Sequence, residues 1–72
     1  MEIRAGNYKP NDILRFVRQN AGLTQEKLAI MIGKSKNWVK NNEQGLNRYF
    51  FEDLIKIAEI CEVEIIIKDK EK

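Results

Sequence analysis

Several side chains of this chain carry amides, hydroxyls and amines that could bind a ligand, whereas histidine is missing and cysteine occurs once. The 72 residues include no His and a single cysteine, Cys61. The chain therefore lacks the commonest metal ligand and general base, and one thiol forms neither an internal disulfide nor a cysteine-based zinc site. It has no nucleophile–base pair and no glycine-rich phosphate loop. We expect a binding module without a cofactor or metal, and not an enzyme.

A group of hydrogen-bonding side chains follows Gly33 in the sequence, at a spacing that places them on one side of a helix. The candidates for contacts with DNA bases are Ser35, Lys36, Asn37 and Asn41. An Asn amide can pair with N6 and N7 of adenine through two hydrogen bonds, and a Lys ammonium can bind O6 and N7 of guanine. On an arbitrary helix the better interpretation of such residues is a solvated face, so their meaning depends on the elements around them.

The hydrophobic pattern predicts four helices that position this group. Apolar residues recur at helical spacing in residues 11–20, 25–32, 36–44 and 50–62. Thr24 and Ser35 are good N-caps for the second and third helices, because a hydroxyl accepts a hydrogen bond from an unpaired N–H group of the first turn. Gly22 and Gly33 end the first and second helices.

The second and third helices are joined in a specific pattern. Ala29 precedes Gly33 by four residues, and Val39 follows Gly33 by six. A small Ala lets the two helices approach closely, a Gly adopts the positive φ of a sharp turn, and Val39 packs inward beneath the second helix. Leu28 provides a further apolar position. Together these residues form a helix-turn-helix signature, which makes the base-contact interpretation better than a solvated face.

At this point the chain resembles the Cro/C1-type (Xre) helix-turn-helix domains of phage and bacterial repressors. The resemblance rests on VRQNAGLTQEKLA (residues 17–29), on residues 35–45 with their Glu–x–Gly ending, and on FEDLIKIA (residues 51–58), and it covers about residues 11–63. It implies a compact all-α, lambda-repressor-like domain of four to five helices. It also implies a repressor that binds double-stranded operator DNA as a homodimer through the major groove, without catalysis.

The resemblance also assigns roles outside the base-contact group. Gln25 should bind a DNA phosphate at the start of the second helix, where the N-terminal N–H groups also favour an anion. Arg18 should form a structural salt bridge, with Glu43 as its partner. Further candidates for phosphate contacts are Lys34, Lys40 and Arg48, which would fix the register on DNA without recognising sequence. For Arg48 a solvated side chain is an equal alternative.

Three positions depart from the family pattern. Lys34 stands where the family has an apolar residue, Asn42 where a buried apolar residue is usual, and Trp38 where a small Ser or Thr often contacts the DNA backbone. One interpretation is that Trp38 turns inward and fills the space that Asn42 leaves. The alternative is that Trp38 packs against DNA sugars or a partner.

The two ends of the chain differ in charge and in expected structure. Residues 1–48 have nine basic and four acidic side chains, a net charge of +5, and residues 49–72 have four basic and seven acidic ones, a net charge of −3. We expect residues 1–9 to be a flexible arm, residues 10–63 the helix-turn-helix domain, and residues 64–72 a strand and tail. The strand is expected over residues 63–68 because the segment is β-branched.

The strand cannot be stable alone, because its N–H and C=O groups need a partner. A second copy of the chain would supply one across a two-fold axis, as in some antitoxin members of the family; a frayed tail, or a strand laid against its own helices, is the alternative. The expected dimerisation residues are Val63, Ile65, Ile66 and Ile67.

Two classes of function fit the sequence. The first is a sequence-specific DNA-binding regulator. The second is an antitoxin-like protein-interaction module that neutralises a partner protein through the acidic C-terminal part. No apolar run approaches the roughly 20 residues of a membrane helix, and no signal peptide is recognisable. We expect a cytoplasmic protein with no membrane contact.

Overall fold

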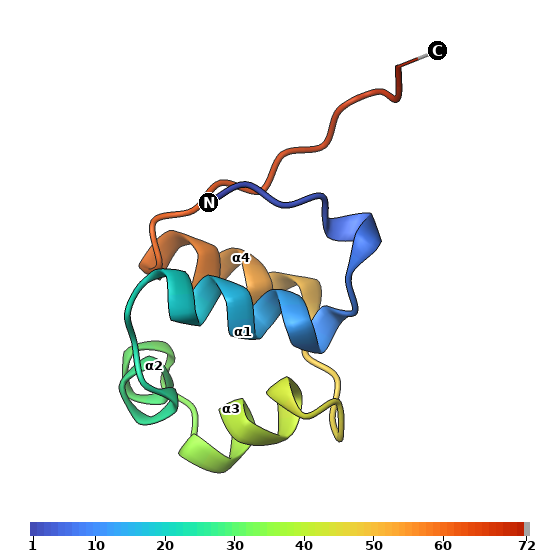
Figure 1. Ribbon diagram of the computed structural model, residues 1–72. Coiled ribbons are helices and arrows are strands. Elements are labelled where there is room, and N and C mark those ends of the chain that lie inside the picture. The colour runs from blue at the N-terminus through green and yellow to red at the C-terminus, as the bar shows by residue number, and fades with distance from the viewer. Residues whose placement is uncertain (72) are drawn as a thin grey trace.

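The computed structural model describes residues 1–71, and within this range the chain is all-helical. A short 3-10 helix, η1 (Ala5–Asn7), precedes the four α-helices α1 (Pro10–Asn20), α2 (Gln25–Ile32), α3 (Lys36–Glu43) and α4 (Phe51–Ile60). Helices α1 and α4 lie side by side (Figure 1). Below them α2 and α3 contact each other, while α3 also contacts α1 and α2 also contacts α4. The expectation of a compact four-helix domain is confirmed.

The helix ends follow from local hydrogen bonding. Pro10 occupies the first turn of α1, where its missing N–H is not needed. The hydroxyl of Thr24 accepts from the backbone N–H of Lys27 at 3.0 Å, and the hydroxyl of Ser35 accepts from that of Trp38 at 3.0 Å. Both predicted N-caps are therefore confirmed.

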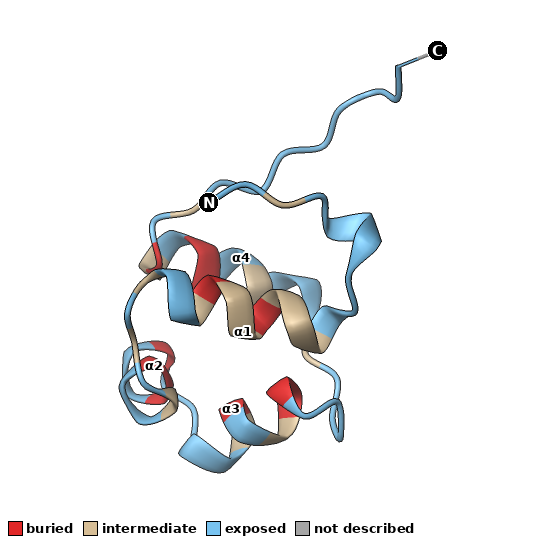
Figure 2. Ribbon diagram, viewed as in Figure 1, coloured by how far each residue is buried: buried red, intermediate tan, exposed pale blue. Residues whose placement is uncertain are grey.

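The core lies between the four helices. Its buried apolar residues are Leu14, Val17, Leu28, Ala29, Ile32, Val39, Ile57, Ala58 and Cys61. In Figure 2 the buried segments face the space enclosed by the four helices, and the solvent-facing sides of the helices are exposed. Leu28 and Val39 are fully buried and Ala29 is nearly so, so the residues of the helix-turn-helix signature form the contact between α2 and α3.

The N-terminal segment packs against the first long helix. The rings of Tyr8 and Phe16 meet edge to face with their centroids 5.2 Å apart, and the guanidinium of Arg15 lies 5.6 Å from the centroid of Phe16. Residues 1–9, expected to be a flexible arm, thus include η1 and an aromatic contact with α1.

The predicted strand over residues 63–68 is wrong for this chain. Helix α4 ends at Ile60, earlier than expected, and Glu62 adopts a left-handed φ of 58° that an α-helix cannot continue. No strand occurs in residues 1–71. The segment begins at Val63, which packs against the core, and then leaves the helices (Figure 1). Within residues 1–71 its backbone has no strand to pair with. Lys72, the last residue of the expected tail, lies outside the described residues.

None of the helices within residues 1–71 is long and apolar enough to cross a membrane.

Candidate nucleic-acid interface

The turn between α2 and α3 places the first turn of α3 on the surface. Gly33 has a φ of 70°, and the backbone N–H of Lys34 donates to the carbonyl of Ala29 at 2.9 Å, which closes the end of α2. Only Gly33, Lys34 and Ser35 separate the two helices. The second helix therefore supports the third, and the N-terminal end of α3 is free to approach a ligand.

The predicted base-contact residues lie along one exposed part of α3. Ser35, Lys36 and Asn37 are exposed at its N-terminal end, and Asn41 is partly buried one turn later. The carbonyl of Asn41 accepts from the backbone N–H of Leu46 at 3.0 Å, so this residue also holds the loop after α3. The first turn of α3 is thus the most accessible part of the candidate interface.

The predicted phosphate-contact residues lie around this helix. Lys40 is exposed on α3, Lys34 in the turn before it and Arg48 in the loop after it, whereas Gln25 is partly buried at the start of α2. A shallow open hollow of about 490 Å³ brings Gln25 and Lys36 to one place, with Arg18, Thr24 and Glu26 completing its lining. Two residues predicted for DNA contact from different helices therefore share one concave surface.

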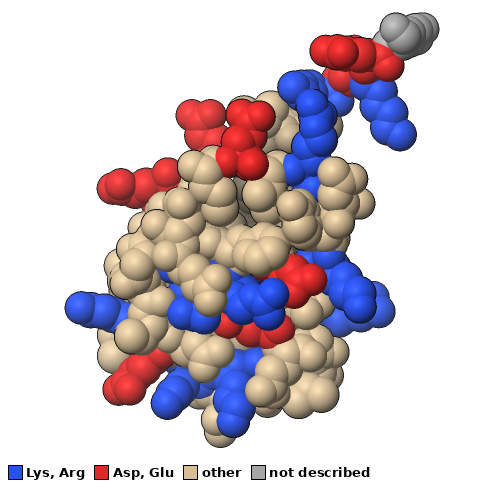
Figure 3. All heavy atoms as spheres, in the orientation of Figure 1, with Lys and Arg blue, Asp and Glu red and all other residues tan. Residues whose placement is uncertain are grey.

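Charged side chains are unevenly distributed over this face of the domain. Figure 3 shows Lys and Arg side chains along the edge where Figure 1 places α3. The acidic side chains on this face gather mainly around the end of α4 and the start of the tail. The Lys and Arg side chains make the α3 edge suited to a polyanion.

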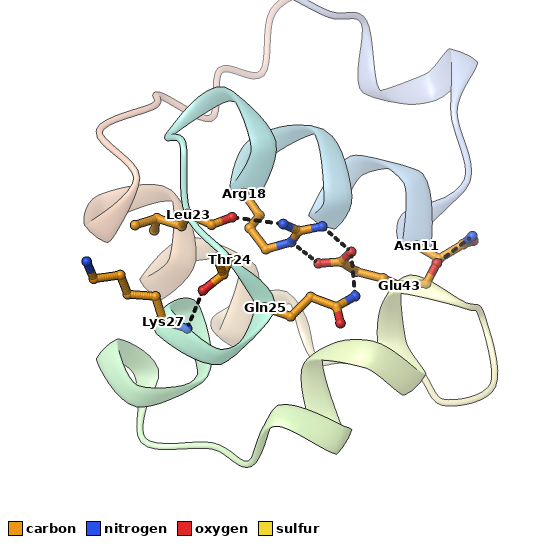
Figure 4. A network of polar contacts seen from close by, with 7 residues as sticks. All are labelled: Asn11, Arg18, Leu23, Thr24, Gln25, Lys27 and Glu43. Atoms are coloured by element: carbon orange, nitrogen blue, oxygen red, sulfur yellow. Dashed lines mark hydrogen bonds and ion pairs between the residues drawn. The ribbon is translucent and has the colours of Figure 1, made fainter.

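A polar network joins Glu43, at the end of α3, to the first two helices (Figure 4). The Nε and Nη2 atoms of Arg18 donate to the two carboxylate oxygens of Glu43, at 2.6 and 2.8 Å. The Nη1 atom of Arg18 donates to the carbonyl of Leu23 at 2.8 Å. The Arg18 side chain is 13% exposed and that of Glu43 is 3% exposed. The predicted Arg18–Glu43 salt bridge is confirmed.

The electrostatics of the pair follow from this geometry. The hydrogen bond to Glu43 raises the pKa of the Arg18 guanidinium; burial acts in the opposite direction, and the charge of Glu43 adds to the rise. Arg18 therefore stays charged. Its contacts with Leu23 and Glu43 tie the α1–α2 loop to the end of α3, which fixes how α3 is presented.

Gln25 belongs to the same network, which the sequence did not reveal. Its Nε2 donates to the Oε1 atom of Glu43 at 3.2 Å (Figure 4). One N–H of the amide is thereby used, and the second remains available. No local pattern could have indicated this bond, because the two residues lie on different helices and 18 positions apart.

Trp38 and Asn42 occupy separate places. Trp38 is partly buried and packs against the core, as the inward interpretation expects. Asn42, however, leaves no empty space for it: Asn42 is itself 1% exposed, and its Nδ2 donates to the carbonyl of Trp38 at 2.8 Å. Among the described residues the Oδ1 atom of Asn42 has no hydrogen-bond partner.

Lys34 and Trp38, two of the departures from the family pattern, also meet each other, which was not predicted. The ammonium of Lys34 lies 5.2 Å from the centroid of the Trp38 ring. The four-residue spacing of the two residues was the available signal.

Comparisons with known proteins support the fold. No family model matches the chain, and no curated protein matches it. A chain of a solved HipA–HipB–O2–O3 complex is 26% identical with a TM-score of 0.68, over 99% of both chains. A chain of a HipB variant in an O2 20mer complex has the same identity and TM-score, over 99% of this chain and 97% of that one. A chain of a HipB–O1–O2 complex is 26% identical with a TM-score of 0.66, over 96% of this chain and 99% of that one. With the α2–Gly33–α3 geometry, these similarities show that the chain is a helix-turn-helix domain.

Proposed function

We propose that this protein is a sequence-specific DNA-binding regulator of the Cro/C1 type, acting as a repressor, that inserts α3 into the major groove. The observation that most supports this is the exposed first turn of α3, where Ser35, Lys36 and Asn37 lie on a helix held against α2 by the Gly33 turn. In helix-turn-helix proteins the N-terminal residues of the recognition helix, which is α3 here, contact the base edges. The similar HipB chains come from complexes with O1, O2 and O3, one of them an O2 20mer, which supports a nucleic-acid ligand.

The residues divide into two roles. Lys36, Asn37 and Asn41 bind base edges, with Ser35 beside them, and each good base contact gives about 1–3 kcal/mol of discrimination. The contacts with the phosphates of the DNA backbone come from Gln25, Lys34, Lys40 and Arg48. Gln25 uses the amide N–H that Glu43 does not occupy, so the polar network aligns Gln25 for a phosphate without preventing the contact.

The protein acts as a homodimer joined through its C-terminal part. Ile66 and Ile67 are 71% and 91% exposed, and an open apolar groove of about 340 Å³ lies between α4 and the tail. The lining of the groove consists of Phe51, Ile55, Ala58, Glu59, Val63, Ile65 and Ile67. A second copy would cover these apolar side chains, which a monomer leaves in water.

The direct test is selection of bound duplexes from a random DNA pool at two salt concentrations. We expect a palindromic consensus with half-sites about 34–36 Å apart, which is one helical turn, and binding that weakens steeply as salt rises. The double variant Lys36→Ala/Asn37→Ala should lose the consensus while its circular dichroism spectrum stays helical. Failure to enrich any sequence, or unchanged binding by the double variant, contradicts the assignment.

An antitoxin-like protein-interaction module is the second candidate. It is favoured by the similarity to a chain of a complex that contains both HipA and HipB, and by the acidic C-terminal part with its exposed Ile residues. Co-expression with the product of the neighbouring gene, followed by size-exclusion chromatography, tests it. A stable heteromeric complex supports this role, and a homodimer that ignores the second protein weighs against it. The two functions can coexist in one protein.

A further inference from the structure

Two of the three departures from the helix-turn-helix family pattern lie in contact with each other. The resemblance described above implies an apolar residue at the position of Lys34 and a small one at that of Trp38. The structure places the Lys34 ammonium 5.2 Å from the centroid of the Trp38 ring. A cation over an aromatic face is attracted by the ring quadrupole, and Trp is the most effective ring for this. The two substitutions are therefore coupled physically.

Trp38 is itself held in place from three directions. Its backbone N–H donates to the Ser35 hydroxyl at 3.0 Å, and its carbonyl accepts from Asn42 at 2.8 Å. Its ring packs against the hydrophobic core. The ring thus gives the long, flexible Lys34 side chain a fixed surface on which to rest.

The contact restrains Lys34 without neutralising it. The ion pairs within residues 1–71 involve Arg15 with Asp12 and Arg18 with Glu43, and no carboxylate lies within 4.0 Å of the Lys34 ammonium in this part of the chain. An aromatic ring, unlike a carboxylate, leaves the full positive charge available to an anion. The backbone of Lys34 is also fixed, through its N–H bond to the carbonyl of Ala29.

We propose that Trp38 is a positioning residue for Lys34: its ring holds the Lys34 ammonium beside the N-terminal end of α3, where the ammonium binds a phosphate of the DNA backbone. This inference rests on the proposed DNA-binding function. Trp38 acts through Lys34. Because the ring already restricts the conformations of the Lys34 side chain in the free protein, less conformational entropy is lost when Lys34 binds the phosphate. Lys40 makes its phosphate contact without such a support.

The test is a double-mutant cycle on the selected operator duplex. Affinity is measured by fluorescence anisotropy at about 25 °C, between about 50 and 300 mM salt, for the wild type, Lys34→Met, Trp38→Leu and the double variant. Salt is varied because log K falls as log salt rises, and each phosphate contact makes this fall steeper by about 0.9. We expect Lys34→Met to weaken binding about three- to tenfold at low salt and to make this fall shallower by about 1.8, which is about 0.9 for the Lys34 of each protomer of the dimer. Trp38→Leu should weaken binding by less, about two- to fourfold, and have no further effect once Lys34 is Met.

Lys40→Met is the matched control, because it removes another exposed Lys of the same surface that Trp38 does not support. In the Lys40→Met background, Trp38→Leu should keep its whole effect. Trp38→Phe, which keeps an aromatic ring, should bind more tightly than Trp38→Leu. The thermal unfolding of each variant is measured in parallel, so that a loss of folded protein is separated from a loss of affinity.

The intrinsic fluorescence of Trp38 gives a second measurement, since the chain has one Trp. We expect the emission to change when a DNA phosphate binds the ammonium beside the ring, and the change to be smaller in Lys34→Met. If Trp38→Leu weakens DNA binding equally with and without Lys34, or if the fluorescence change does not depend on Lys34, the positioning role of Trp38 is overturned while the proposed DNA-binding function stands. Absence of DNA binding by the wild type would instead overturn the proposed function, and the phosphate role of Lys34 with it.

Discussion

The guanidinium of Arg18 donates two hydrogen bonds to the carboxylate of Glu43, at 2.6 and 2.8 Å, although the residues lie 25 positions apart. The Oε1 atom of the same carboxylate accepts from the amide of Gln25 at 3.2 Å. One nearly buried acidic side chain therefore connects α1, α2 and α3. The orientation of the candidate recognition helix depends on this contact as well as on the Gly33 turn.

We predict that removal of either partner of this pair destabilises the domain strongly. Arg18→Met leaves the buried carboxylate of Glu43 without its cationic partner, and the free energy of unfolding should fall by about 3–5 kcal/mol. Urea unfolding followed by circular dichroism measures the change. Arg15→Met is the control, because Arg15 and Asp12 form a pair in which both side chains are more exposed, 38% and 28%, and its loss should cost less than about 1 kcal/mol. Equal losses of unfolding free energy in the two variants would show that the Arg18–Glu43 pair stabilises the domain no more than the Arg15–Asp12 pair does.

The unpaired Oδ1 atom of Asn42 is expected to reduce stability. Asn42 is 1% exposed, and a buried polar atom without a partner costs about 1–3 kcal/mol. Asn42→Leu removes this cost and extends the core, so we expect the urea midpoint to rise by an amount equivalent to about 1 kcal/mol. Asn37→Leu, at an exposed position of the same helix, controls for helix propensity. A lower midpoint in Asn42→Leu would mean that the site cannot hold the larger side chain.

Substitution at Gly33 tests the turn between α2 and α3. Gly33 has a φ of 70°, and a Cβ atom added at this position would find no atom within 4 Å, so any cost comes from backbone strain and not from a clash. We expect Gly33→Ala to lower the free energy of unfolding by about 1 kcal/mol. Gly33→Asn should cost less, because Asn tolerates this conformation better. Gly6→Ala is the control, since Gly6 is equally uncrowded and has no positive φ; a similar loss in both variants would contradict the strain explanation.

Because the thiol of Cys61 is buried, we predict that the stability of the domain falls at alkaline pH. Burial raises its pKa above the ordinary value of 9.0, because desolvation disfavours the thiolate. A group whose pKa is raised by folding contributes stability that is present below the unfolded pKa and lost as the pH rises through the folded pKa. We therefore expect the free energy of unfolding, under reducing conditions, to decline above about pH 9.

The variant Cys61→Ala separates the contribution of this thiol to the pH dependence from the contributions of other titrating groups. Burial also raises the pKa of Tyr49 above its ordinary 10.0, so part of the decline at still higher pH should persist in the variant. Between about pH 9 and 10 the variant should be less sensitive to pH than the wild type. Identical pH profiles of the two proteins in urea unfolding would rule out the thiol as the source.

Much of the fold could be predicted because its signals are local. Thr24 and Ser35 each cap a helix through a residue three positions later, and Gly33 ends α2 by its own conformation. The strand over residues 63–68 was predicted wrongly for the same reason. β-branched residues favour extended backbone, and the tail is extended, but a strand also requires a neighbour.

The candidate site was predicted in its residue types and not in its contacts. The sequence indicated the exposed amides and amines of α3, and the structure places Lys36 and Asn37 on its exposed first turn. It did not indicate that Gln25 is bonded to Glu43, or that Lys34 rests on Trp38. It also suggested a space beside Asn42 that does not exist, because the amide itself is buried there.

By itself the sequence determined the four α-helices, the N-caps of α2 and α3, and the helix-turn-helix connection. These depend on hydrophobic spacing and on hydrogen bonds between residues within about one turn of each other. Only the tertiary structure decided which polar groups meet, as in the bonds from Arg18 and Gln25 to Glu43, where the partners are 25 and 18 residues apart. Such contacts depend on how whole helices pack, and a short sequence window contains no information about packing between distant segments.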